Sequence, residues 1–153
     1  MTKQCSEVLK RLEGKTLATA ESCTGGLIGA MLTSVPGASK VYKGGIISYW
    51  SQVKETLLGV SGEDLECLGP VSMQVAGSMA DGARKALQAD LAISVTGLAG
   101  PDGDEFGRPV GTVFVGFSNG QKTAVKQCAF SGSREEIRTQ AAHAALEWLL
   151  ENV

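Results

Sequence analysis

Two adjacent nucleophiles followed by paired glycines stand in the segment AESCTGG, residues 20–26. The hydroxyl of Ser22 needs a base before it can attack a carbonyl carbon, whereas Cys23 would attack as a thiolate, whose pKa a helix start lowers. Gly25 and Gly26 would let a ligand approach the backbone closely. The N–H groups of a helix beginning here would bind an anion or a developing oxyanion. The segment therefore predicts nucleophilic catalysis or anion binding.

The same segment also has a purely structural interpretation. Ser22 and Thr24 belong to the residue types that cap helix N-termini, and a lone cysteine such as Cys23 is commonly a buried packing residue. Residue type and spacing do not decide between a cap and a site. They also do not decide between the two nucleophiles, because neighbours in one turn have a similar reach.

A serine nucleophile requires a base, and the chain contains one histidine. His143 lies about 240° around the expected last helix from the apolar Ile137, which predicts a position near the polar face and away from catalysis. Lys54 is the better candidate, because it falls in the first turn of a helix that Ser51 could cap. The helix dipole and burial would both favour its neutral amine, although the residue taken alone is better explained as an exposed lysine.

Tyr49 and Thr96 are candidates for the same pocket, because each stands at the expected end of a strand. Tyr49 lies five residues before Lys54 and could relay a proton, or it could be a sheet aromatic with its hydroxyl in water. Thr96 opens a loop rich in Gly, Pro and Asp, residues 97–107. Loops at strand ends commonly line sites, so its hydroxyl could donate a hydrogen bond to a ligand.

Arg134 is a cation at the expected start of the last helix, where the helix dipole disfavours positive charge. A ligand phosphate held by Arg134 and the helix N–H groups would compensate for this, and so would the neighbouring Glu135 or Glu136. Both interpretations stay open on the residues alone.

Three acidic residues, Asp102, Asp104 and Glu105, are the remaining cluster that could suggest a ligand. Their spacing does not match a calcium-binding EF-hand loop, which needs further ligands and a glutamate at its last position. A solvated turn accounts for them, so the sequence predicts no metal and no cofactor.

Alternating periodicities place these residues on an α/β framework. Ser133 and Glu136 form a capping box at the start of the last helix, and Asn119-Gly120 predicts a type I′ hairpin. Helices are expected at about residues 2–13, 24–34, 51–59, 72–87 and 134–151, and strands at about 16–20, 45–50, 90–95, 110–118 and 122–130. The order predicts a single domain, residues 1–153, with a three-layer α/β/α sandwich around one mixed sheet.

Composition excludes several classes of partner. The chain has 153 residues, 43% of them hydrophobic, and a net charge of -2, so duplex nucleic acid is not an expected partner. No apolar run approaches the roughly 18 residues of a membrane span. The four cysteines lack CxxC pairing, which favours reduced thiols in the cytoplasm. The expected partner is a small nucleotide, and the hairpin offers an edge through which a homo-oligomer could form.

Six segments, in order and at matching separations, resemble the C-terminal domain of the CinA (competence- and damage-inducible protein) family. They are AESCTGG, GGIISYWSQVKETLLGV, GPVS, SVTGLAGPDG, PVGTV and SGSR. The resemblance runs from about Thr16 to the last helix. Each segment alone is weakly specific, whereas the ordered set is strongly so. Many members of that family carry an additional N-terminal domain similar to molybdopterin-binding proteins, which has no counterpart in these residues.

The resemblance implies a nicotinamide mononucleotide deamidase, which hydrolyses the carboxamide to nicotinate mononucleotide and ammonia in bacterial pyridine-nucleotide recycling. By the same resemblance the nucleophile is Ser22, which decides against Cys23. Tyr49 and Lys54 fall on the Y-x4-K segment, Thr96 on SVTG and Arg134 on the SGxR segment.

The expected mechanism starts with neutral Lys54, assisted by Tyr49, taking the proton of Ser22. Thr24, Gly25 and Gly26 are expected at the substrate, N–H groups of residues 23–25 with Thr96 at the oxyanion, and Arg134 at the phosphate. Two alternatives remain: a nucleotide-binding module without catalysis, and an interaction protein linked to DNA uptake or damage. The acidic balance disfavours the second.

Overall fold

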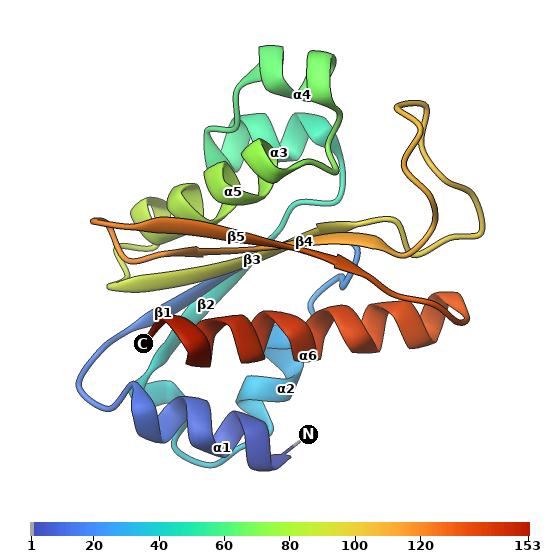
Figure 1. Cartoon of the computed structure of the whole chain (residues 1–153). Coiled ribbons are helices and arrows are strands. Elements are labelled where there is room, and N and C mark those ends of the chain that lie inside the picture. The colour runs from blue at the N-terminus through green and yellow to red at the C-terminus, as the bar shows by residue number, and fades with distance from the viewer. Residues whose placement is uncertain (1) are drawn as a thin grey trace.

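One five-stranded sheet forms the centre of the protein in a computed structural model that describes residues 2–153 (Figure 1). The strand order is β2-β1-β3-β4-β5. The central β1 pairs in parallel with β2 and β3, whereas β4 is antiparallel to both of its neighbours. This confirms the predicted mixed sheet. The strands are β1 Leu17–Glu21, β2 Tyr42–Ile47, β3 Leu91–Gly97, β4 Thr112–Ser118 and β5 Thr123–Ala129.

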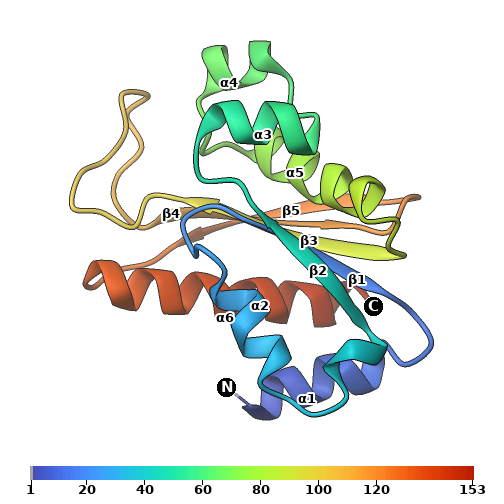
Figure 2. The ribbon, with the colours of Figure 1, turned by 180° about the vertical axis from the view of Figure 1, so that it is seen from behind.

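Helices cover both faces of this sheet, as the two opposite views show (Figures 1 and 2). One face carries α1 Thr2–Arg11, α2 Leu27–Thr33 and α6 Arg134–Asn152, and the other carries α3 Ser51–Leu58, α4 Gly62–Leu68 and α5 Met73–Ala86. A short 3₁₀ turn, Ala38–Lys40, precedes β2. The arrangement confirms the predicted three-layer sandwich.

Strand alternation divides the apolar side chains between two cores. In β1, Leu17 packs with α1, α2 and α6, while Ala18 and Ala20 pack with residues of α3, α4 and α5. Successive strand residues point to opposite faces, so Ser22, which follows β1 and has the same parity as Ala20, belongs to the α3–α5 face. Its N–H still donates to Val95 O at 3.0 Å, which extends the ladder by one residue.

Three predicted boundaries were wrong, one beside glycines and two at the exit from β2. The helix predicted from residue 24 begins at Leu27, because Gly26 has a φ of 106 and residues 24–26 form a turn. Ser51 is the first helical residue and not the cap, since the N-cap is Trp50, which makes no side-chain capping bond. β2 ends at Ile47, three residues before the predicted end.

Two local predictions in the C-terminal half were confirmed. The capping box of Ser133 and Glu136 is present, and β4 and β5 form the predicted hairpin. The predicted turn was wrong, however: Asn119 N donates to Lys122 O at 3.1 Å, so the central residues are Gly120 and Gln121, and of these only Gly120 has a positive φ, 88. Positive φ at the first central residue alone is the pattern of a type II′ turn. The short helix α4, capped by Ser61, was not predicted at all.

Within residues 2–153, no helix is both long enough and apolar enough to cross a bilayer.

Candidate active site

A pocket of about 230 Å³ lies at the carboxyl ends of the three parallel strands. In open α/β sheets, ligands bind at this edge where neighbouring strands connect in opposite directions, and β1 between β2 and β3 is such a point. Ser22 and Lys54 form its floor, and Tyr49 and Arg134 its rim. Its walls include Pro70, Val71, Thr96, Leu98, Ala99 and Asp102.

The floor consists of a direct hydrogen bond between Lys54 and Ser22. Lys54 Nζ lies 2.9 Å from Ser22 Oγ, 2.6 Å from Ser48 O and 3.2 Å from Tyr49 O. Lys54 is 1% exposed, and this burial lowers the pKa of its amine to about 8. A neutral amine has two N–H donors and one lone pair. The two carbonyls can take both donors, which leaves the lone pair for the Ser22 hydroxyl.

The exit from β2 brings Lys54 to this position. Ser48 N donates to Glu21 O at 2.8 Å, so the chain stays beside β1 for one residue beyond the strand. It then turns at Trp50 into α3, whose first turns lie over the same sheet face. Lys54 extends back from that helix to the end of β1. Two neighbouring parallel strands and one helix turn are therefore sufficient to place the pair.

Arg134 and Tyr49 meet at the rim. Arg134 Nη2 donates to the Tyr49 hydroxyl at 2.9 Å, and its Nη1 donates to Gly100 O at 2.5 Å. Tyr49 is 54% exposed, and the atom it offers Lys54 is its backbone carbonyl. Among residues 2–153, no hydrogen bond joins the Tyr49 phenol to Lys54, so the predicted proton relay between them is not supported. Tyr49 instead orients the guanidinium of Arg134.

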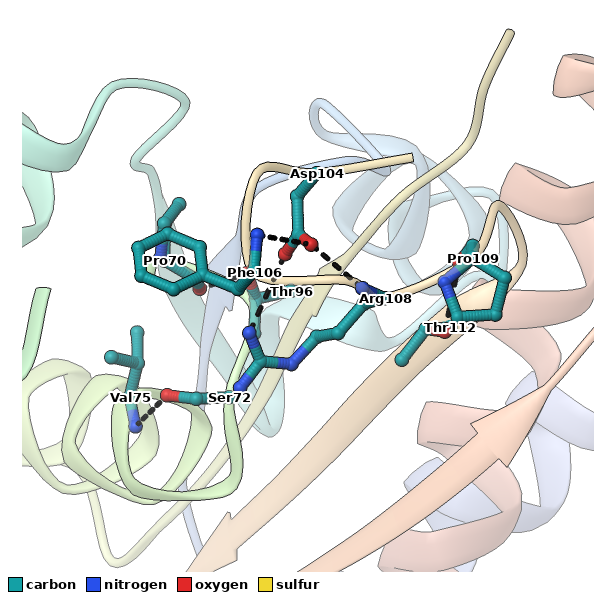
Figure 3. Close-up of polar contacts among 9 residues, drawn as sticks. All are labelled: Pro70, Ser72, Val75, Thr96, Asp104, Phe106, Arg108, Pro109 and Thr112. Atoms are coloured by element: carbon teal, nitrogen blue, oxygen red, sulfur yellow. Dashed lines mark hydrogen bonds and ion pairs between the residues drawn. The ribbon is translucent and has the colours of Figure 1, made fainter. Parts of the chain in front are cut away.

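Thr96 and the start of the loop that follows it form one wall of the pocket. Figure 3 shows the polar contacts of Thr96 and of the loop. Thr96 Oγ1 donates to Pro70 O at 2.7 Å, so its proton is already engaged. Within the loop, Asp104 Oδ1 accepts from the N–H groups of Phe106 and Arg108 at 3.0 and 2.9 Å. The Phe106 ring lies so close to Gly69 that a side-chain carbon there would meet it at 2.6 Å. These contacts brace the wall from within the chain.

Asp104 thus supports the loop, and no group of three or more His, Cys, Asp or Glu side chains in the described part of the chain could hold a metal ion.

Glu21 is a site residue that the sequence reasoning missed. It is 2% exposed, and its carboxylate accepts from Thr24 Oγ1 at 2.6 Å. It also accepts from the N–H groups of Ile28, Gly29 and Gly26 at 2.9, 3.1 and 3.3 Å. The start of α2 is therefore filled by a carboxylate of the protein itself. Its only local signal was an acidic residue shortly before a helix start.

This filling changes the expectation for three predicted substrate-binding residues. Thr24 is fully buried with its hydroxyl on Glu21, and neither it, Gly25 nor Gly26 lines the pocket. A side-chain carbon at Gly25 would face Arg138 of α6. The Thr24 side chain, Gly25 and Gly26 thus shape the turn behind the pocket wall, and of these three residues only the Thr24 backbone N–H has no acceptor in the described structure.

Arg138 of α6 donates to two carbonyls of the same turn. Its Nε donates to Cys23 O and its Nη2 to Thr24 O, both at 2.9 Å. The N–H of Gly25 is taken by Ser22 O at 3.0 Å, which removes it from the predicted oxyanion donors. The N–H groups of Cys23 and Thr24 donate to no other residue of the described structure. They are the donors left for an oxyanion.

Cys23 and His143 are disfavoured as catalytic groups. Burial raises the pKa of the Cys23 thiol to about 11, so it stays protonated beside the Ser22–Lys54 pair. His143 lies between α6 and α1, where its Nδ1 is 2.7 Å from Gln4 Oε1. It does not line the pocket, as the helix periodicity predicted.

Comparison with known proteins now assigns the family, since the family model described as the CinA C-terminal domain matches residues 1–153. The chain belongs to the CinA C-terminal domain family. A CinA-like protein of Geobacter sulfurreducens is 48% identical over 141 residues, which are 92% of this chain and 34% of that protein. The CinA domain described here thus spans about one third of the length of the curated relatives it matches.

Solved CinA structures share the whole fold. A competence-damaged protein (CinA) superfamily protein from Escherichia coli superposes with a TM-score of 0.97 at 34% identity, covering 99% of this chain and 90% of that one. A competence/damage inducible protein from Agrobacterium tumefaciens gives a TM-score of 0.94 at 35% identity, covering 98% and 93%.

Proposed function

We propose that this CinA domain is an amidohydrolase that converts nicotinamide mononucleotide and water to nicotinate mononucleotide and ammonia. The observation that carries the proposal is the buried hydrogen bond between Lys54 Nζ and Ser22 Oγ. A hydroxyl next to a lysine whose pKa is lowered is an activated nucleophile of the kind used in acyl transfer. A cytoplasmic role in pyridine-nucleotide recycling, with no cofactor, belongs to the same proposal.

The reaction proceeds through an acyl-enzyme. Neutral Lys54 takes the proton of Ser22 as its oxygen attacks the carboxamide carbon, and the N–H groups of Cys23 and Thr24 bind the oxyanion. Protonated Lys54 then gives its proton to the leaving nitrogen, and ammonia departs. A water, deprotonated in turn by Lys54, attacks the acyl carbon and releases nicotinate mononucleotide and free Ser22.

The pocket also suits the rest of the substrate. Arg134 offers a guanidinium at an exposed rim, which fits a phosphate that stays partly in water. Val71 and Leu98 give apolar wall for the pyridine ring, and Asp102 brings a carboxylate that complements the positive charge of the pyridinium. Tyr49 holds the guanidinium in place and is assigned no proton transfer.

An ammonia assay with nicotinamide mononucleotide tests the proposal. The wild-type protein is expected to release ammonia and nicotinate mononucleotide in equal amounts, and Ser22→Ala to release neither while keeping its melting temperature. Cys23→Ala is the matched control, because it removes the adjacent pocket nucleophile and should retain turnover. Activity that survives in Ser22→Ala but not in Cys23→Ala would reverse the assignment.

Two other results would replace the proposal. Wild-type protein that binds nicotinamide mononucleotide in calorimetry but releases no ammonia over hours would be a nucleotide-binding module. Affinity for DNA that falls steeply with salt in a gel shift would favour an interaction protein instead.

A further inference from the structure

The turn after Ser22 has an unusual hydrogen-bond pattern. Eight successive N–H groups, residues 22–29, stand where a strand becomes a helix, and six are taken by acceptors of the protein. Glu21 alone accepts three of them. The two left over, on Cys23 and Thr24, immediately follow the nucleophile. Buried backbone N–H groups are rarely left without a partner, so an unpaired pair at this place needs an explanation.

The direction of these two N–H groups depends on Arg138. In a trans peptide unit, the C=O and the N–H that follows it point in opposite directions. Arg138 Nε holds Cys23 O, so the Thr24 N–H must point away from α6. Arg138 Nη2 holds Thr24 O, so the Gly25 N–H also points away from α6, where it donates to Ser22 O. The Gly25 N–H also fixes the direction of Ser22 O, and the Cys23 N–H of the same peptide unit points the opposite way.

The opposite side of the turn from α6 is the side of the chemistry. Helix α6 covers one face of the sheet, and α3, which carries Lys54, covers the other (Figures 1 and 2). Ser22 belongs by strand parity to the α3 face, where its hydroxyl meets Lys54. An N–H group of this turn that points away from α6 therefore points toward the sheet face that carries Lys54.

We propose that Arg138 is a positioning residue that sets the oxyanion hole, by holding Cys23 O and Thr24 O so that the N–H groups of Cys23 and Thr24 face the carbonyl attacked by Ser22. The assignment rests on the acyl-transfer step of the proposed function, but not on the identity of the amide. The proposal assigns different roles to two arginines that lie one turn apart on α6. Arg134 faces the ligand at the rim, and Arg138 faces the backbone of the turn.

The side-chain type matters for this role. A guanidinium is a planar fork whose Nε and Nη2 can reach two neighbouring carbonyls at fixed separation, whereas a lysine ammonium is a point donor on a flexible stem. Arg138→Lys would keep the charge and lose the second contact. Either peptide unit of the turn could then rotate. N–H donors misplaced by a fraction of an ångström bind the transition state less well.

Acylation of Ser22 by p-nitrophenyl acetate tests the positioning role apart from the amide substrate. The burst of p-nitrophenol gives the acylation rate, and mass spectrometry of the intact protein locates the acetyl group. Arg138→Met and Arg138→Lys are expected to lower the acylation rate constant on the order of 10- to 100-fold, with little change in the half-saturating ester concentration. Guanidinium ion added to Arg138→Ala should restore part of the rate.

Arg84→Met is the matched control, because Arg84 is a partly buried arginine on α5 that pairs with Asp81 and does not line the pocket. It should acylate at the wild-type rate. Melting temperatures of all variants separate loss of folding from loss of positioning, and the Arg138→Lys variant, which retains the charge, keeps the test valid if Arg138→Met unfolds.

A rate loss in folded Arg138→Lys, larger than that in Arg84→Met, supports the proposal. Wild-type acylation rates in Arg138→Met or Arg138→Lys would overturn it, and so would a wild-type protein whose Ser22 is never acylated. If Ser22 is acylated in an Arg138-dependent manner but nicotinamide mononucleotide yields no ammonia, the proposed substrate fails while the positioning role stands.

Discussion

The floor and the rim of the pocket differ in how far water reaches them. At the floor, Lys54 and Ser22 are 1% and 8% exposed, and the amine contacts Ser22 Oγ and the carbonyls of residues 48 and 49. At the rim, Tyr49 is 54% exposed and Arg134 is exposed as well. Burial is what lowers the pKa of the amine, whereas a guanidinium stays charged in water. Proton transfer is therefore expected at the floor and charge recognition at the rim.

The two regions also draw on different parts of the chain. The floor comes from residues 22–54, where two parallel strands and α3 follow each other closely. The rim joins Tyr49 to Arg134, which lies 85 residues further along, and to the loop at Gly100. If the division of labour is correct, changes at the floor should affect kcat and changes at the rim should affect KM.

Lys54→Met should have the largest effect, because it removes the base from the floor. General bases contribute on the order of 10²- to 10⁴-fold, so kcat for nicotinamide mononucleotide should fall by that amount at neutral pH. The measurement is steady-state ammonia release, with Lys126→Met on β5 as a control for the loss of a lysine. An increase in KM with unchanged kcat would instead assign Lys54 to binding.

The pH dependence should follow the Lys54 amine. Its pKa in the folded protein is lowered to about 8, and catalysis requires the neutral form. Activity should therefore be fully present above this pKa and fall about tenfold per unit as the pH drops below it. The profile of kcat/KM from about pH 6 to about pH 10 measures this. Activity that stays constant down to pH 6 would mean that another group acts as the base.

Arg134→Met should raise KM for nicotinamide mononucleotide on the order of 10- to 100-fold and leave kcat nearly unchanged, because a charge-assisted bond to phosphate contributes about 1.5–3 kcal/mol. Nicotinamide riboside, which lacks the phosphate, is the control substrate. Its KM should be the same in wild type and variant. Equal losses for both substrates would place Arg134 in a structural role at the rim.

His143→Ala should have the smallest effect on turnover, since the imidazole lies outside both regions. kcat and KM should stay within about twofold of wild type. The loss of the contact with Gln4 should lower the free energy of unfolding by about 1 kcal/mol, measured by urea denaturation. A large loss of kcat would show that the floor and rim do not contain the whole catalytic apparatus.

Local sequence signals were sufficient for much of the framework. The capping box of Ser133 and Glu136, the hairpin between β4 and β5, and the apolar stripe of α5 depend on residues close together in the chain. The boundaries that failed, at Leu27 and Ile47, follow from backbone turns that glycines and a strand exit permit but do not require. Helix α4 was missed because its seven residues carry almost no periodic signal.

The sequence by itself determined the layered fold, the family resemblance and the identity of the candidate nucleophile, because these depend on periodicity and on ordered motifs. Only the tertiary structure decided the partners. In the fold, the Tyr49 hydroxyl accepts from Arg134, and the Glu21 carboxylate accepts from N–H groups at the start of α2. Arg138, which is 115 residues from Cys23 in the sequence, donates to Cys23 O. The physical reason is that burial and long-range hydrogen bonds depend on which elements pack together, and residue spacing along one element carries no such information.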